Sequence, residues 1–244
     1  MSSRVGLAWR LFAELLGTMF LVATVVGSGI MATRLSPTDT GLQLLENSVA
    51  TMLALAVLIV VFAPVSGAHL NPVVSLADWW LGRAGRTGIP GRDLAGYVLA
   101  QCAGGIGGAV LANLMFDLSA VAWSRHERAG TGLWLGEVVA TAGLVLVIFA
   151  LSRTGRGALT PATVGAYIGA AYWFTSSTSF ANPAVTLGRA FSDTFAGIAP
   201  GSVPGFVVAQ LVGLLAGTVL VVALYPAPSR TGKADALALT GQIP

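Results

Sequence analysis

The sequence predicts an all-α membrane protein with six transmembrane helices and two half-helices in an inverted repeat. Three observations lead to this fold class. The chain of 244 residues is 55% apolar and only 9% charged, its uncharged stretches are long, and each half contains one Asn-Pro motif. Ordinary soluble domains have roughly 25% charged residues. The whole chain is therefore expected to lie in a membrane, rather than to carry a single anchor.

Six stretches of the chain are long enough for a bilayer crossing, which takes about 20 residues. Two of them contain a single charged residue, Glu14 and Glu137, and the others contain none. One uncharged run is too long for one span and fits a span followed by a loop. The six stretches are residues 11–33, 47–68, 94–116 and 129–152, the span-and-loop run 157–188, and a last span near 204–224.

Two Asn-Pro motifs predict short helices between these spans. Asn71-Pro72-Val73 and Asn182-Pro183-Ala184 lie 111 residues apart, and an uncharged or nearly uncharged run too short to cross a bilayer follows each one. Asparagine is a preferred N-cap, and proline suits the first position of a helix. We expect half-helices over residues 71–81 and 182–191. Interrupted segments at matching positions of two halves indicate a transport site.

The two halves also resemble each other outside these motifs. Glu14 matches Glu137 at a spacing of 123 residues, and Gln101 matches Gln210 at a spacing of 109. Each half has three spans with a half-helix before its third, and an odd number of spans requires the second copy to be inverted in the bilayer. The predicted divisions are a first repeat over 1–120, a second repeat over 121–225 and a cytoplasmic tail over 226–244.

Lys and Arg positions predict the orientation, because cytoplasmic loops are enriched in them. With six spans and both termini in the cytoplasm, nine basic residues fall inside and four outside. The inside set is Arg4, Arg10, Arg83, Arg86, Arg92, Arg153, Arg156, Arg230 and Lys233, and the outside set is Arg34, Arg125, Arg128 and Arg189.

The motifs carry a resemblance to a known family. Residues 66–73, Ser-Gly-Ala-His-Leu-Asn-Pro-Val, and residues 179–184, Ser-Phe-Ala-Asn-Pro-Ala, resemble the two signature loops of the aquaporin family. The paired glutamates and glutamines also match, and the resemblance covers residues 8–224. It implies six tilted helices around one pore per subunit, half-helices that meet at the midplane, and a homotetramer in a lipid bilayer. The glutamates are then expected to hold the half-helix loops.

The physical basis of such a pore can be argued from the residues. A helix N-terminus carries roughly half a positive charge. Two N-termini aimed at the pore centre oppose the passage of protons and cations. The side-chain nitrogens of Asn71 and Asn182 can donate to a passing oxygen while their oxygens cap the half-helices. We expect His69, two residues before Asn71, to line the cytoplasmic vestibule, and a pH gate there is an alternative role.

The resemblance also implies a second constriction, at positions counted from the two motifs. These positions are Thr51, Ala170, Ser179 and Val185. In relatives that conduct water or glycerol, the last position is arginine and at least one other is aromatic or histidine. All four are small or medium and uncharged here, which predicts a wide, neutral filter for larger uncharged solutes. The alternative is that Arg189, four residues further along, compensates at the mouth.

A small subset of bacterial aquaglyceroporin-like channels is similar in having valine at this position. That resemblance implies arsenite, as neutral As(OH)3, and methylated arsenicals among the solutes, beside water and glycerol-like polyols. It also implies a multi-pass protein of the bacterial inner (plasma) membrane. Alternatives are a general water channel, a secondary transporter coupled to protons through Glu14 or Glu137, and a membrane adhesion or scaffold protein.

The sequence argues against several functional classes. No nucleophile and base fall together in the spans, so we do not expect an enzyme. The chain has two histidines and one cysteine, too few for a metal site by ligand count, and we expect no cofactor. The net charge of +3 is small and gives no reason to expect nucleic acid as a partner.

Overall fold

The computed structural model describes residues 5–83, 85 and 87–226. These residues form α-helices and two short 3-10 turns, and no strand. The prediction of an all-α fold is therefore confirmed. In chain order the helices are α1 (Leu7–Leu35), α2 (Thr40–Ser66), α3 (Pro72–Gly82), α4 (Gly91–Met115), α5 (Thr131–Arg153), α6 (Thr160–Phe174), α7 (Pro183–Arg189) and α8 (Val203–Leu224).

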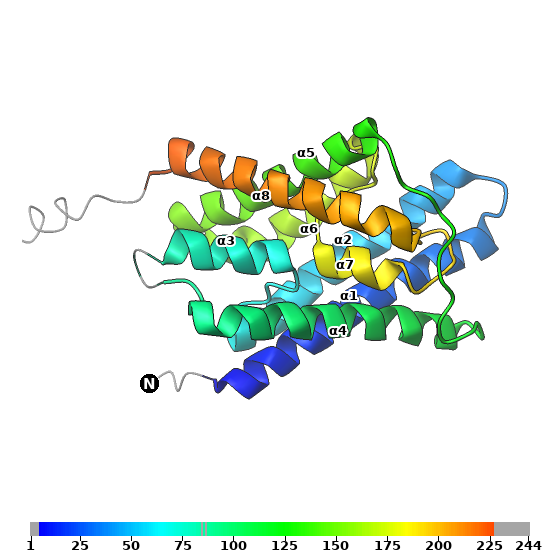
Figure 1. The fold of residues 1–244 in the computed structure, drawn as a ribbon, viewed down its shortest axis with the longest axis horizontal. Helices are drawn as coiled ribbons and strands as arrows, with labels where there is room; N and C mark the ends of the chain where they lie inside the picture. Colours follow the sequence, from blue (N-terminus) through cyan, green and yellow to red (C-terminus); the bar gives the residue numbers. More distant parts are fainter. Residues whose placement is uncertain (1–4, 84, 86, 227–244) are drawn as a thin grey trace, which may run out of the picture.

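The long helices run along the longest axis of the molecule, with the short helices α3 and α7 between them (Figure 1). Both short helices begin immediately after an asparagine of a predicted motif, at Pro72 and Pro183. The first matches its predicted range closely, whereas the second ends at Arg189, two residues before the expected end. The described chain begins and ends at the same end of the molecule (Figure 1). The predicted tail 226–244 lies outside the described residues, except for Pro226.

Five helical segments of the described chain are long and apolar enough to cross a membrane: α1, α2, α4, α5 and the segment Pro200–Leu224 that contains α8. The sixth predicted span is α6, which has only 15 residues. At 1.5 Å per residue it is about 22 Å long, shorter than the ~30 Å hydrocarbon core of a bilayer. The run 157–188 thus contains a short helix, and the chain after it returns to the interior, where Asn182 is buried.

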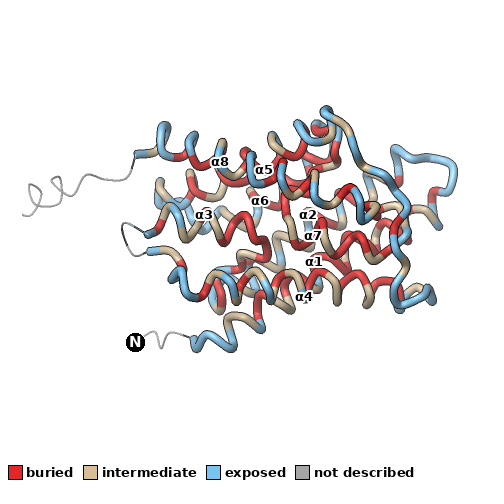
Figure 2. Tube along the Cα trace, in the orientation of Figure 1, coloured by how far each residue is buried: buried red, intermediate tan, exposed pale blue. Residues whose placement is uncertain are grey.

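The outward faces of the helices are apolar. Large apolar side chains are exposed along α2 and α8. The buried residues lie mainly toward the interior of the molecule (Figure 2). The exposed set on these two helices includes Leu53, Val57, Val60, Val61, Val208, Val212, Leu215, Val219 and Val222. Such a continuous apolar surface needs a nonaqueous environment. It fits contact with lipid tails or with apolar partners in a membrane.

Glycines allow the long helices to pack closely. A Cβ atom added to Gly104 of α4 would collide with the backbone of Leu15 in α1. In the second half, a Cβ atom on Gly213 of α8 would lie 2.7 Å from the Val138 oxygen of α5. The same kind of contact therefore joins the first and last long helices of each half. Small residues at such positions let membrane helices approach each other.

Candidate functional site

The two motif asparagines bring the N-termini of α3 and α7 together at the centre. Asn71 caps α3 through its side-chain oxygen, which accepts from Val73 N at 2.9 Å. Its side-chain nitrogen donates to the carbonyl oxygen of Ala181, at 2.8 Å. Asn182 makes the equivalent contacts in the second half. Its side-chain oxygen caps α7 by accepting from Ala184 N, and its side-chain nitrogen donates to the carbonyl oxygen of Leu70, at 2.8 Å. Each asparagine is therefore held by the loop that leads into the opposite half-helix.

This arrangement leaves donors for a solute. An asparagine amide has two N–H donors. In the part of the chain that the structure describes, only one acceptor is found for each of the two amides. Both asparagines line one central cavity. The second N–H of each side chain is thus available to an oxygen atom within that cavity.

The loops before the two asparagines share an unusual backbone conformation. Ala68 and Leu70 have φ angles of 49° and 48°, and Ser179 and Ala181 have 50° and 48°. The second pair lies 111 residues after the first, the same offset as the asparagines. A non-glycine residue in this left-handed region costs about 1–2 kcal/mol. Such strain persists only where the surroundings hold the backbone in place.

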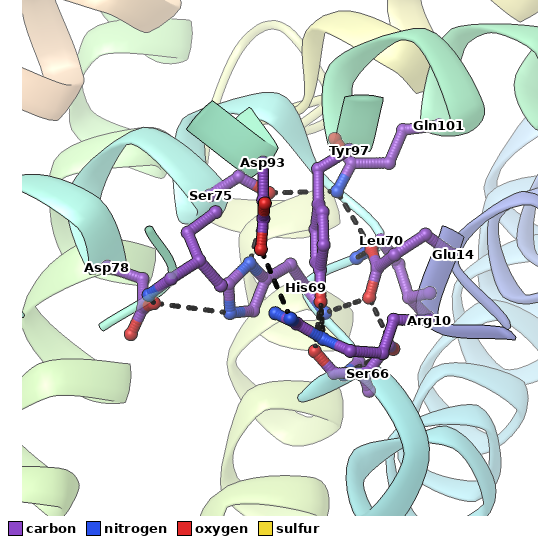
Figure 3. A network of polar contacts seen from close by, with 12 residues as sticks. Arg10, Glu14, Ser66, His69, Leu70, Ser75, Asp78, Asp93, Tyr97 and Gln101 are labelled. Carbon is purple, nitrogen blue, oxygen red and sulfur yellow. Dashed lines mark hydrogen bonds and ion pairs between the residues drawn. The ribbon is translucent and has the colours of Figure 1, made fainter. Parts of the chain in front are cut away.

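Glu14 holds the first of these loops (Figure 3). Its carboxylate is fully buried and accepts from the backbone nitrogens of His69, at 3.0 Å, and Leu70, at 2.6 Å. Ser66 and Gln101 also donate to it through their side chains, at 2.5 and 2.8 Å. Four donors satisfy a carboxylate well and compensate for its burial. The predicted structural role of Glu14 is confirmed.

Glu137 holds the second loop in the same way. It is fully buried and accepts from Phe180 N at 2.8 Å and from Ala181 N at 2.9 Å. The side-chain nitrogen of Gln210 donates to it at 2.6 Å. The pairs Glu14–Gln101 and Glu137–Gln210 thus have equivalent roles: in each half, a glutamine donates to the glutamate that binds the loop before the half-helix. Both carboxylates therefore serve as hydrogen-bond acceptors for these loops.

The central cavity has a volume of about 280 Å³. Most of the predicted site residues line it, from both half-helices and from α2. Those that do are Thr51, His69, Asn71, Ser179, Asn182 and Val185. The hydroxyl oxygen of Ser179 is buried and has no hydrogen-bond partner among the described residues. A solute oxygen in the cavity could complete its hydrogen bonding.

Ala170 is not in this lining, so that part of the prediction is wrong. It is exposed on the surface of α6. Tyr172 takes its place: it lines the cavity, is only 3% exposed, and donates to the Thr51 hydroxyl at 3.2 Å. Two residues along a helix turn the side chain by about 200°. Counting from the motif therefore selected the wrong face of α6.

Residues outside the four predicted filter positions add aromatic and charged groups to the lining. Tyr172 and Phe180 contribute aromatic rings to the cavity. Arg189, the last residue of α7, contributes a guanidinium group and is only 2% exposed. Val185 itself lines the cavity and packs in an apolar cluster with residues of α1 and α4. The filter position Val185 is apolar, but the lining as a whole contains charged groups.

His69 and Asp78 lie where the cavity meets a second, wider pocket, at the end that holds the N-terminus. Figure 3 shows His69 between Ser75, at 3.0 Å from Nδ1, and Asp78, at 3.7 Å from Nε2. Asp78 also accepts from Ile89 N at 2.7 Å, and so it fixes the loop between α3 and α4. Asp78 is not among the site residues predicted from the sequence. Asp78 lines both the central cavity and the wider pocket, so it lies at the constriction, or neck, between them.

Arg189 also lines a third pocket, of about 400 Å³, at the opposite end. Gln43, Asn47 and Arg128 contribute to the same pocket. Burial lowers the pKa of the Arg128 guanidinium from its usual value, and the negative charge of Glu137 opposes that shift. The central cavity therefore lies between a wide pocket at one end and a smaller, basic pocket at the other.

Comparisons with known proteins agree with this geometry. Residues 1–181 match the model of the family described as "Major intrinsic protein". The chain is 53% identical over 211 residues to Aquaglyceroporin AqpS of Rhizobium meliloti, covering 86% of this chain and 88% of that protein. It is 32% identical to a glycerol uptake facilitator protein of Pseudomonas aeruginosa, with 77% and 75% covered.

The fold itself has a solved counterpart. The X-ray structure of the aquaglyceroporin from Plasmodium falciparum matches with a TM-score of 0.64, covering 88% of this chain and 93% of that one, at 22% sequence identity. At that identity the likeness concerns the fold alone. Together with two half-helices that meet at paired asparagines over one cavity, the family match is decisive: the chain belongs to the major intrinsic protein family, whose members include the aquaporins and aquaglyceroporins.

Proposed function

We propose that this protein is a passive channel that conducts glycerol-like polyols, water and arsenite across the bacterial plasma membrane. Membership of the family makes it a channel for small neutral solutes rather than an enzyme. The observation that carries the proposal is the central cavity, which both asparagines line and which adjoins a pocket at each end. Such a cavity offers a route along the long axis of the molecule.

The cavity favours neutral solutes over cations. The N-termini of α3 and α7 meet at Asn71 and Asn182. Each N-terminus carries roughly half a positive charge. A cation at this point meets both partial charges, whereas a hydroxyl oxygen accepts hydrogen bonds from the asparagine amides. Water and polyols can exchange their hydrogen bonds to bulk water for these donors.

The proposal of arsenite rests on the small residues of the filter. Val185 presents no charge where many relatives have arginine, and Thr51 and Ser179 offer hydroxyl groups. As(OH)3 is a neutral molecule with three hydroxyls, close to glycerol in size and hydrogen bonding. Tyr172 narrows the same region, so the passage is less open than its other residues suggest. Methylated arsenicals belong to the same size class and are candidates on the same argument.

We further propose that the two halves, residues 1–120 and 121–225, are inverted repeats with both chain termini in the cytoplasm. The matched offsets of the asparagines and of the left-handed loop residues support the repeat. The basic residues predict the orientation, although Arg4, Arg86, Arg230 and Lys233 lie outside the described residues. The exposed apolar faces of the helices fit a homotetramer in the bilayer.

Stopped-flow light scattering on proteoliposomes tests the proposal. Vesicles are exposed in turn to gradients of an impermeant sugar, glycerol and arsenite. We expect faster water, glycerol and arsenite movement than in empty liposomes. If water alone moves faster, the protein is a general water channel and the solute assignment is wrong. If no solute moves faster, the adhesion or scaffold alternative gains support.

A further inference from the structure

Arg189 occupies a position that connects two cavities. It lies four residues after Val185 on the same face of α7, about 6 Å further along the helix axis. It lines the central cavity, and it also lines the basic pocket of about 400 Å³ beyond it. Among the described residues, no other one belongs to both linings. Arg189 therefore stands at the neck between the two.

The first half of the chain indicates that this position is set by the fold. Arg189 is the seventh residue after Asn182, and Asp78 is the seventh after Asn71. Asp78 likewise lines both the central cavity and the pocket at its own end. The third residues after the asparagines, Val185 and Val74, line the cavity between the necks. The fold thus places an apolar residue near the centre and a charged residue at each neck.

The Arg189 side chain is held in place and keeps donors to spare. Its Nε donates to the carbonyl oxygen of Ala196, and its guanidinium lies 3.4 Å from the centre of the Phe180 ring. Within the described chain, no acceptor is found for its terminal nitrogens and no carboxylate pairs with it. An arginine has five N–H donors in a fixed plane. Four of them remain for a solute.

The surroundings of this neck are positive. Arg128 lies over the same Phe180 ring, at 5.2 Å, and donates to the carbonyl of Gly197. Arg128 lines the basic pocket together with Arg189, and no aspartate or glutamate of the described chain does. Gln43, Asn47 and Thr178 add polar groups to that lining. A neutral solute with hydroxyl groups finds hydrogen bonds here, whereas a cation meets two fixed positive charges.

We propose that Arg189 is the selectivity-determining cation of this channel, acting one helical turn outside the apolar position Val185. The inference rests on the proposed function and adds a named residue to the two half-helix N-termini as a source of its cation exclusion. A solute first meets Arg189, which donates hydrogen bonds to its oxygens, and then passes Val185 and Tyr172. Charge selection and size selection are therefore made at separate levels of the pore.

The test compares K⁺ leak and glycerol entry in proteoliposomes of the wild type and three variants. Arg189→Gln removes the charge but keeps a donor for the Ala196 carbonyl, which protects the fold. Arg189→Lys keeps the charge but loses the planar set of donors. Arg125→Leu is the control, because Arg125 is an exposed arginine of the same end, 91% exposed in its side chain. Circular dichroism checks the folding of each.

We expect Arg189→Gln to raise the K⁺ leak about tenfold, since an arginine in a pore is an electrostatic barrier to cations. Arg189→Lys should stay tight to K⁺ and pass glycerol about two- to fivefold more slowly, because it offers fewer donors in fixed positions. The control should change neither. A folded Arg189→Gln protein that stays tight to K⁺ would overturn the inference. So would an Arg189→Lys protein that leaks as much as Arg189→Gln, or a wild type that leaks K⁺.

These measurements distinguish a failure of the proposed function from a failure of the role of Arg189. If the wild type passes no glycerol, the proposed function is wrong. If the wild type passes glycerol but the K⁺ leak does not change when the charge of Arg189 is removed, the proposed function stands and the inference alone is wrong.

Discussion

Replacing Glu137 by glutamine tests whether this buried carboxylate holds the fold or carries protons. The carboxylate accepts three hydrogen bonds, from Phe180 N, Ala181 N and Gln210 Nε2, at 2.8, 2.9 and 2.6 Å. A glutamine side chain offers one acceptor oxygen and an NH2 group that can only donate. At least one of the three donors must therefore lose its partner. The loop that contains the left-handed Ser179 and Ala181 loses part of its anchor.

The expected loss follows from these contacts. A hydrogen bond to a charged group contributes about 1.5–3 kcal/mol, and a buried donor without a partner costs about 1–3 kcal/mol. We expect Glu137→Gln to lower the free energy of unfolding by about 3–5 kcal/mol in total. For a protein of this size each kcal/mol shifts the melting midpoint by about 2–4 °C. The midpoint should therefore fall by about 6–20 °C.

Thermal melting in detergent, followed by circular dichroism, measures this loss. Glu127→Gln is the matched control, because Glu127 is exposed in the loop before α5. Glycerol entry into proteoliposomes is measured in parallel with and without a proton gradient. A variant that melts within about 2 °C of the wild type, less than 1 kcal/mol, but has lost transport would refute the structural role. It would favour the proton-coupled transporter.

Three further substitutions probe the pore and its packing. Val185→Arg should reduce the flux of glycerol and arsenite more than that of water in the stopped-flow assay; an equal loss of all three would indicate misfolding. Tyr172→Ala should raise the ratio of glycerol to water permeability, because it removes aromatic bulk from the lining; an unchanged ratio would mean that Tyr172 does not limit the passage. Gly105→Ala should destabilise the protein by about 1–3 kcal/mol, as overpacking does, because its Cβ atom would lie 2.5 Å from the Ala184 oxygen of α7. Its control in the melting assay is Gly107→Ala, where the nearest atom lies at 3.8 Å, and equal melting of the two would contradict the packing argument.

Much of the fold is encoded in local patterns and was therefore predictable from the sequence. Asn71 and Asn182 cap helices because their side-chain oxygen accepts from backbone N–H groups, and proline follows each of them. That chemistry needs no knowledge of distant residues. Charges in apolar spans are rare, so Glu14 and Glu137 stood out as well. Their matched spacing indicated equivalent roles in the two halves.

The orientation of side chains around the pore was less predictable. Ala170 and Tyr172 differ by two positions, and only the rotation of α6 about its axis decides which one faces the cavity. That rotation depends on the packing of α6 against α2 and α5, which no local pattern reports. The position of Arg189 depends on how the following loop returns, since Ala196 accepts its hydrogen bond. Counting residues from a motif does not capture such contacts.

The time course of glycerol entry tests the central claim most directly. Proteoliposomes receive labelled glycerol outside, with and without an inward proton gradient. A passive channel predicts faster entry than in empty liposomes, a rate proportional to the glycerol concentration, and a final inside concentration equal to that outside under both conditions. Accumulation above the outside concentration when the proton gradient is present, or entry no faster than in empty liposomes, would contradict the account.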